Sequence, residues 1–574
     1  MKKTVLITSL GLVILLIAGL FFSRDYFVTN RQLKFSYPFQ NALFPNDFTA
    51  PTFYWNDGLA NVKSWKVTVE LKSSEKTFTA IVTKDQWKPE ISAWDSIKSL
   101  SKNKDVLVQV ERSEPSQTDF LKSKARVTIK ISEYDVAAPI LYRQIILPTA
   151  FAEANNQFTS YDLVDVSSDK PPKVVLGGFK VCGNCHTIST DGKTIGLDFD
   201  AVRRDKGGYF VSKIDSVITF DKDNYFSWSK LIGKNTFGLL SRLSRDGRYI
   251  MVTIKDRVVF ERFEDLAYSQ LFFPVNGILA VYDTQTKTIR ELPGANDPDF
   301  VQTNAVWTPD DKNIIFARAK ALPYPEKDSM RESIITDPSI TADFVSGKKE
   351  FKFDLYMIPF NDGKGGKAEP IAGASNNGKS NYFPTVSPDG KWIVYCQADN
   401  YMMLRPDSRL YILPVKGGEA RKLKCNLPDL NSWHDWSPNG KWLVFTSKSL
   451  SIFTDLFLTH IDSEGNASVP VLVDIQKRMD CALNYPMFVN RDPKKPFTMD
   501  YRYVNTNDIL EALAQKDTTA VYKLLDTFFK QKQIGMPIEY FDIYRIYSQL
   551  GNNKEAEKYQ KLGEEAVKKL NSGF

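Results

Sequence analysis

The residues best placed to do chemistry form one short motif. Cys182, Gly183, Asn184, Cys185 and His186 spell C-x-x-C-H, the attachment signature of c-type haem. In that chemistry two thiols one turn apart bond the vinyl groups of the porphyrin, and the adjacent histidine reaches the iron. The chain has only five cysteines and three histidines, so a chance occurrence has odds on the order of one in several thousand. The motif predicts a haem c held by Cys182, Cys185 and His186.

Two other uses of the cysteines stay open. An oxidising compartment favours a plain disulfide between Cys182 and Cys185. A zinc ion needs two further ligands, which Cys425, His434 or Cys481 supply if the fold brings them close. A thiol–disulfide enzyme is disfavoured, because the motif leads into a hairpin and not into a helix.

A second histidine shares the repeat position of His186. His186 and His434 each lie three residues before a serine that begins a turn, Ser189 and Ser437. His434 is therefore the candidate second metal ligand, and Met479 and Met487 are alternative axial ligands of iron. The alternative interpretation is that His434 packs inside its strand.

Internal repetition predicts the elements that position these residues. Five segments have a strand, a turn of the Asp-Gly or Asn-Gly type, and a second strand rich in aromatic and β-branched residues. Such hairpins, with further strand pairs between them, are typical of propeller blades, and with a degenerate copy from Asn484 we expect six blades. The five copies are CHTISTDGKTIGLDF from Cys185, LSRLSRDGRYIMVTI from Leu240, NAVWTPDDKNIIFAR from Asn304, FPTVSPDGKWIVYCQ from Phe383 and WHDWSPNGKWLVFTS from Trp433.

These repeats resemble a known pattern. S-P-D-G-K-x-[ILV]-x-[FY] is the repeat of TolB-like propellers, related to the WD-type repeat, and Ser387 to Tyr395 match it closely. With APILYRQIILP, VCGNCHTIS and DKGGYFVSKID, the chain resembles a family of bacterial envelope proteins that combine such a propeller with a C-x-x-C-H motif. Its members are often labelled cytochrome c-related or cytochrome c biosynthesis proteins. The resemblance implies a TolB-like propeller over residues 173–500 and a haem role for the motif.

The first residues predict the compartment. Lys2 and Lys3 precede an apolar run from Val5 to Phe22, which is typical of an export signal. No small-x-small cleavage site stands out before Ser23, so residues 1–23 are expected to be an uncleaved inner-membrane anchor in preference to a cleaved signal peptide. The lysines stay inside, which places the rest of the chain in the periplasm of a bacterium.

The remaining domains follow from changes in periodicity. Residues 34–135 alternate apolar and polar positions and predict an immunoglobulin-like β-sandwich, with four tryptophans as core: Trp55, Trp65, Trp87 and Trp94. Residues 136–172 carry four prolines and predict a linker. Residues 505–574 change to a helical period, and residues 550–559 resemble half of a tetratricopeptide repeat. The chain is therefore expected to be mainly β with a helical tail.

Composition excludes some functions. The net charge of +7 is spread over 75 basic and 68 acidic residues without a basic block, so nucleic acid is not an expected partner. No G-x-S-x-G elbow, phosphate-binding loop or H-E-x-x-H motif occurs, and we expect no enzyme. Two hypotheses remain: a membrane-tethered haem protein with a redox partner, and a non-enzymatic envelope scaffold that binds proteins or glycans, in which the C-x-x-C pair is a structural disulfide.

Overall fold

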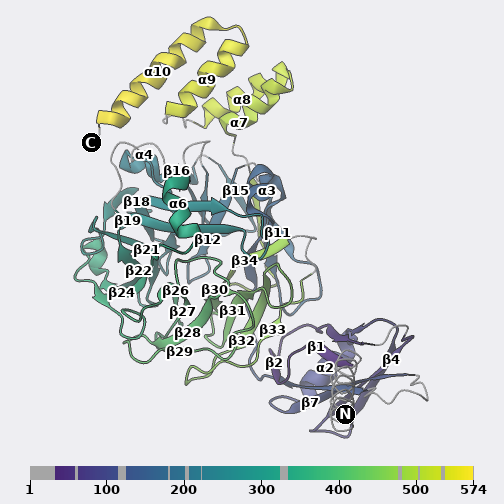
Figure 1. Cartoon of the computed structure of the whole chain (residues 1–574). Helices are drawn as coiled ribbons and strands as arrows, with labels where there is room; N and C mark the ends of the chain where they lie inside the picture. The colour runs from purple at the N-terminus through teal and green to yellow at the C-terminus, as the bar shows by residue number, and fades with distance from the viewer. Residues whose placement is uncertain are drawn as a thin grey trace, which may run out of the picture. The chain divides into compact units, whose positions relative to one another are not determined.

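The computed structural model describes residues 33–58, 62–113, 124–178, 181–200, 206–221, 223–322, 334–475, 481–501, 504–531 and 537–572 (Figure 1). The chain forms two units. One comprises Met1–Val136, Val166–Asp169 and Ser468–Asp474, and the other Ala137–Asp165, Lys170–Ala467 and Ile475–Phe574. The predicted anchor at residues 1–23 lies outside the described residues. Within the described ranges, no helix is long and apolar enough to cross a membrane.

In its described residues, the first unit consists of two sheets and one helix. The four predicted core tryptophans are all buried, and Trp55 in one sheet contacts Trp65 in the other with ring centroids 6.0 Å apart. The returning segment 468–474 contains β33 (Val471–Leu472), and the Leu472 amide donates to the Tyr37 hydroxyl over 2.9 Å. The sequence analysis did not predict the helix α2 (Ile91–Leu100). The sheets have the orders β2-β8-β7-β4-β5 and β1-β3-β6, with β1 (Lys34–Tyr37), β2 (Ala42–Phe44), β3 (Phe53–Asn56), β4 (Trp65–Leu71), β5 (Thr77–Val82), β6 (Gln86–Trp87), β7 (Asp105–Arg112) and β8 (Lys124–Ile131).

The second unit contains the repeats, which form a succession of mainly antiparallel sheets. Every innermost strand packs against the next in the order β34, β12, β17, β21, β26, β30, and β30 packs against β34. Such a closed ring is a β-propeller, so this prediction is confirmed. The strands are β12 (Gly183–Ile188), β13 (Thr194–Phe199), β14 (Gly208–Lys213) and β16 (Tyr225–Ser227); β17 (Arg242–Leu243), β18 (Tyr249–Arg262), β19 (Gln270–Asp283) and β20 (Thr288–Glu291); β21 (Phe300–Trp307), β22 (Asn313–Lys320), β24 (Asp354–Pro359) and β25 (Glu369–Pro370); β26 (Ser380–Val386), β27 (Trp392–Ala398), β28 (Arg409–Pro414) and β29 (Arg421–Lys422); and β30 (Asn431–Trp436), β31 (Trp442–Ser447) and β32 (Asp455–His460).

The ring is closed by a sheet made from both ends of the repeat region. Its order is β11-β10-β9-β34, with β9 (Ile140–Ile146), β10 (Ser160–Val164), β11 (Lys173–Gly177) and β34 (Cys481–Phe488). Residues 136–172 are therefore not the predicted linker, because they hold β9 and β10. The prolines that suggested a linker flank these strands and do not interrupt them.

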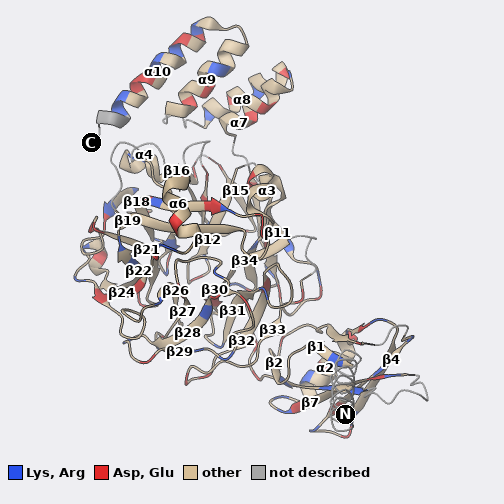
Figure 2. Cartoon of the chain, in the orientation of Figure 1, with Lys and Arg blue, Asp and Glu red and all other residues tan. Residues whose placement is uncertain are grey.

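Smaller elements complete this unit. The strand β15 (Val217–Phe220) pairs in parallel with β35 (Thr498–Tyr501), and β23 (Ile334–Ile335) pairs with β18. Short helices lie between the strands: α3 (Thr149–Ala154), η1 (Asn156–Phe158), α4 (Trp228–Ile232), α6 (Pro338–Val345) and η2 (Asn361–Gly363). The chain ends in α7 (Thr506–Ala514), α8 (Thr518–Lys530), α9 (Pro537–Gln549) and α10 (Asn553–Ser572), and the tetratricopeptide resemblance stays a prediction. Both basic and acidic residues occur along α10 (Figure 2).

Each repeat turn is held by the serine or threonine that defines it. The Ser387 hydroxyl donates to the Asp389 carboxylate over 2.6 Å and accepts the Trp392 amide over 3.0 Å. Equivalent donors and acceptors lie 2.6 to 2.9 Å apart in four other turns: Ser189 and Asp191, Ser244 and Asp246, Thr308 and Asp310, and Ser437 and Asn439. The turn therefore fixes the register of the innermost strand against the next one.

We predict that Ser387→Ala lowers the stability of the protein, because the Trp392 amide and the Asp389 carboxylate both lose a partner at a residue that is 2% exposed. The expected cost is about 1 to 3 kcal/mol, measured as a lower Tm in thermal unfolding. The exposed Ser346→Ala is the matched control and should change Tm little. Equal Tm values for Ser387→Ala and the parent protein would contradict this role.

Candidate functional site

A cavity of about 440 Å³ lies beside the innermost strands of the propeller, where they begin. Both motif cysteines line it, together with Arg143 from β9 and Trp433 from β30. Ligand sites in proteins commonly have volumes of about 300 to 1,000 Å³. The C-x-x-C pair therefore lies in the wall of a space that is large enough for a small organic ligand.

A β-bulge in the innermost strands aims side chains toward this space. The register of β12 against β13 shifts between Gly183 and His186, and β21, β26, β30 and β34 shift at the corresponding place. Cys185 occupies the bulge position of its repeat, four residues before Ser189. The corresponding residues of the other repeats have left-handed backbones with φ between 34° and 61°: Leu240, Asn304, Phe383, Trp433 and Tyr485.

His186 points away from the cavity. Its side chain is 1% exposed, and its ring meets Tyr161 and Tyr485 edge-on with centroids 5.7 and 5.4 Å apart. Cys185 lines the cavity, whereas the imidazole of His186 packs against the two tyrosine rings. Burial lowers the pKa of His186 to about 3, and the nearby Arg242 acts in the same direction. His186 is therefore neutral and enclosed.

His434 is also enclosed, against β27 of the neighbouring sheet. Its Nε2 lies 3.0 Å from the Val394 carbonyl oxygen and its Nδ1 lies 3.8 Å from the Cys396 sulfur. Burial lowers its pKa to about 4. The predicted pairing of His186 with His434 on one metal does not form, because β34 lies between β12 and β30 in the ring. The repeat alignment correctly placed the two histidines in equivalent positions. The side chains at these positions pack between neighbouring sheets.

The other proposed metal ligands are not brought together either. Cys425 and Cys481 are fully buried, and the Met487 sulfur accepts a hydrogen bond of 3.2 Å from Arg242. Met479 lies outside the described residues. In the part of the chain that the structure describes, no group of three or more His, Cys, Asp or Glu side chains could hold a metal ion. The zinc interpretation therefore gains no support.

Both motif cysteines are thiols that the protein keeps protonated. Burial raises the pKa of Cys182 to about 11 and that of Cys185 to about 12. Nearby carboxylates act in the same direction, Asp200 on Cys182 and Asp198 on Cys185, whereas Arg143 opposes them. A thiol with a raised pKa is a poor nucleophile.

The two acidic residues of the strand after the motif are buried. Asp198 and Asp200 are 2% and 8% exposed. Asp198 accepts the Leu240 amide over 3.2 Å, and Asp200 pairs with Lys206 at the cavity wall. The signal was present in the sequence, because the second strand of a blade is covered on both faces and TIGLDF is apolar almost throughout.

A long hairpin closes one side of the cavity. The strands β18 and β19 have 14 residues each, and their ends carry Phe260, Arg262, Gln270 and Phe272 into the cavity wall. The tip at 263–269 is held by loops that come from other sheets. Lys448 donates to the Leu266 and Ala267 carbonyls over 2.9 and 2.6 Å, and the Ser269 hydroxyl lies 3.0 Å from that of Thr149. We call the residues 260–272 the strap.

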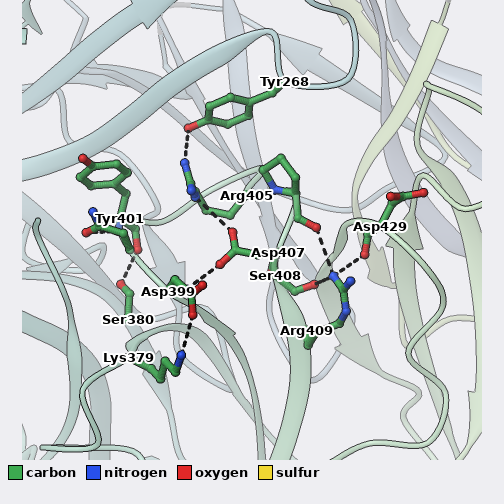
Figure 3. A network of polar contacts seen from close by, with 12 residues as sticks. Tyr268, Lys379, Ser380, Asp399, Tyr401, Arg405, Asp407, Ser408, Arg409 and Asp429 are labelled. Atoms are coloured by element: carbon green, nitrogen blue, oxygen red, sulfur yellow. Dashed lines mark hydrogen bonds and ion pairs between the residues drawn. The ribbon is translucent and has the colours of Figure 1, made fainter. Parts of the chain in front are cut away.

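A polar network fastens the strap to the loop between β27 and β28 (Figure 3). Arg405 donates to the Tyr268 hydroxyl over 3.1 Å and lies 3.4 Å from the Asp407 carboxylate. The preceding residues Met403 and Leu404 line the cavity with left-handed backbones, at φ 65° and 55°. Such conformations cost energy and persist where surrounding contacts impose them, so the network holds these two side chains in the wall.

Comparison with known proteins gives only distant similarities. No protein-family model matches the chain. The uncharacterized protein Atu1656 of Agrobacterium fabrum is 36% identical over 78 residues, which are 14% of this chain and 24% of that protein, so the chain matches about a quarter of that relative's length. A structure of TolB from Acinetobacter baumannii aligns with 67% of this chain and 79% of its own at 14% identity and a TM-score of 0.38.

Two further solved structures have similarly low sequence identities and TM-scores. Putative TolB from Agrobacterium tumefaciens covers 61% of this chain and 98% of its own at 13% identity and a TM-score of 0.32. The periplasmic gluconolactonase PpgL of Pseudomonas aeruginosa covers 58% and 82% at 13% identity and a TM-score of 0.31. At these TM-scores the similarities carry no argument about ligand or activity.

We predict that the motif thiols of the reduced, folded protein react slowly with iodoacetamide. With pKa values of about 11 and 12, their thiolate fraction grows as pH rises through 10. At pH 8 this fraction, and with it the rate, should lie roughly two hundredfold (Cys182) and roughly two thousandfold (Cys185) below that of an ordinary thiol with a pKa near 8.5. Peptide mass spectrometry at pH 7 to 10.5 measures the rates. The urea-unfolded protein is the control, and a plateau above pH 9 in the folded protein would contradict the raised pKa values.

The strap generates a second prediction. In Lys448→Met the tip loses both hydrogen bonds to Leu266 and Ala267, so the cavity should open and alkylation of Cys182 and Cys185 should accelerate severalfold at constant pH. The exposed Lys416→Met is the matched control, with no expected change. Unchanged rates in Lys448→Met would show that the strap does not guard the thiols.

Proposed function

We propose that this protein is an extracytoplasmic β-propeller binding protein whose ligand site is the cavity beside Cys182 and Cys185. The observation that carries the proposal is the cavity of about 440 Å³ between the innermost strands and the strap. Six sheets form the propeller ring in this proposal, and the sheet of β9 and β34 closes it. The helical tail is then the part available to a protein partner in the envelope.

Binding, as opposed to catalysis, is supported by how the charged groups at the cavity are used. Asp200 is paired with Lys206, and Glu153 with Arg262 at 2.6 Å. Active sites shift pKa values toward reactive forms, whereas burial shifts Cys182 and Cys185 toward the unreactive thiol. A scaffold that holds a ligand agrees with both features.

The haem prediction fits the structure poorly. A c-type haem needs two thiols one turn apart and a histidine facing the same space. Here the segment is a strand paired with β13, the cysteines face the cavity, and the His186 ring is packed between Tyr161 and Tyr485. His186 could ligate a haem iron in the cavity only if β12 left its pairing. We therefore assign the cysteines to the wall of the binding site, as thiols or as a disulfide.

The location outside the cytoplasmic membrane is part of the proposal and rests on the sequence. Residues 1–23 have the charge and apolar length of an inner-membrane anchor or an export signal. In this location the chain can reach envelope proteins or glycans. Fractionation of cells into periplasm, membrane and cytoplasm tests it, and a cytoplasmic protein would contradict it.

We predict that the protein, produced in a periplasm with haem-attachment machinery, carries no covalent haem. The expected result is no reduced pyridine-haem band and an intact mass equal to the polypeptide, or lower by two hydrogens if Cys182 and Cys185 are joined. A known c-type cytochrome made in the same cells is the control. One covalently bound haem that is lost in Cys182→Ala would overturn the assignment of the cysteines to the wall of the site.

A further inference from the structure

We propose that the cavity binds a small amphipathic organic anion, with its carboxylate or sulfonate on Arg143 and its apolar body against the strap. This inference rests on the proposed binding function and names the ligand class. It follows from one unpaired cation on one side of the cavity, an aromatic wall from the strap, and the size of the space between them.

Arg143 is the cation at the cavity wall that lacks a counter-ion among the described residues. The other cations there, Lys206 and Arg262, are paired with Asp200 and Glu153. The Arg143 Nε is shielded from solvent and has no acceptor in the described part of the chain. A shielded N–H without an acceptor is costly, and a planar anion that accepts two hydrogen bonds from a guanidinium removes this cost. Arg143 is therefore set up for a carboxylate-like group.

Pairing in the closing sheet brings Arg143 to this place. Arg143 lies in β9 opposite Asn484 of β34, directly before the bulge residue Tyr485. Cys185 in β12 and Cys182, directly before it, line the same cavity, and β12 packs beside β34. The anion group of a ligand on Arg143 would thus lie among polar side chains and near both sulfur atoms.

The strap supplies the apolar surface. The ring of Phe272 contacts the rings of Phe237 and Phe260, with centroids 5.8 and 5.7 Å apart. The Phe237 backbone is fixed because its amide donates to the buried Asp256 carboxylate over 2.6 Å. Leu404, which the Arg405 network positions, extends this surface. An aromatic or short aliphatic body can replace water against these groups, which favours binding by the hydrophobic effect.

Three probes with the same eight-carbon chain and different head groups show how much the charge and the apolar chain of the ligand each contribute to binding. Ligand-observed NMR titration of the full-length protein with octanoate, 1-octanol and octylammonium gives three affinities. Octanoate should bind about tenfold more tightly than 1-octanol, the order expected of a charge-assisted hydrogen bond, and octylammonium more weakly than either. In Arg143→Gln, octanoate should fall to the affinity of 1-octanol, whose own affinity stays constant.

The alkylation rates of the two cysteines show whether the ligand binds in the cavity that they line. Octanoate should slow the reaction of Cys182 and Cys185 with iodoacetamide in the reduced protein but not in Arg143→Gln. Arg245→Gln, at an exposed turn residue, is the matched control and should behave as the parent protein. Circular dichroism confirms that each variant is folded.

Each remaining outcome is decisive. Equal affinities of octanoate and 1-octanol, both lost in the cavity-filling Leu404→Trp, would overturn the anion inference and leave the binding cavity intact. Binding that Leu404→Trp does not reduce, or no binding of any probe, would overturn the proposed cavity function itself. An unchanged preference for octanoate over 1-octanol in Arg143→Gln would show that Arg143 does not bind the carboxylate.

Discussion

The antiparallel pairing of β34 with β9 is the constraint on which the rest of the propeller depends. It joins the last repeat to strands that precede the first one, so the two ends of the repeat region share one sheet and hold the ring closed. The same pairing sets Arg143 opposite Asn484 and next to Tyr485, and it brings β34 beside β12. The features of the cavity wall are therefore consequences of ring closure, which explains why Arg143 and the motif cysteines meet there although they come from different segments.

The bulge of the innermost strands places side chains from several repeats at the wall of the cavity. In five repeats it holds a non-glycine residue at positive φ, and in the first repeat Cys185 takes that place. One repeat position thus supplies the cavity wall with the aromatic side chains of Trp433 and Tyr485 and also with the Cys185 thiol. The next position turns inward to the sheets, where His186 and His434 are packed. Cys185 and His186 are adjacent in the sequence, yet the first lines the cavity and the second is packed in the core.

The sequence predicted the scaffold far better than the site. The turn chemistry at Ser387 and its equivalents, and the core role of Trp55 and Trp94, are local properties that a single sequence displays. The haem interpretation assumed that residues adjacent in a motif act together, which holds in a helical turn but not in a strand. Arg143 could not be found, because its segment reads as a linker and its role comes from pairing with β34.

The most direct test of the account is a crystal structure of the full-length protein grown with 4-iodobenzoate, whose iodine gives an anomalous signal. The account predicts one iodine peak in the cavity near the strap, the carboxylate on Arg143, and a His186 ring still packed between Tyr161 and Tyr485. An iodine peak outside the cavity, or a His186 side chain that faces the cavity, would contradict the central claim.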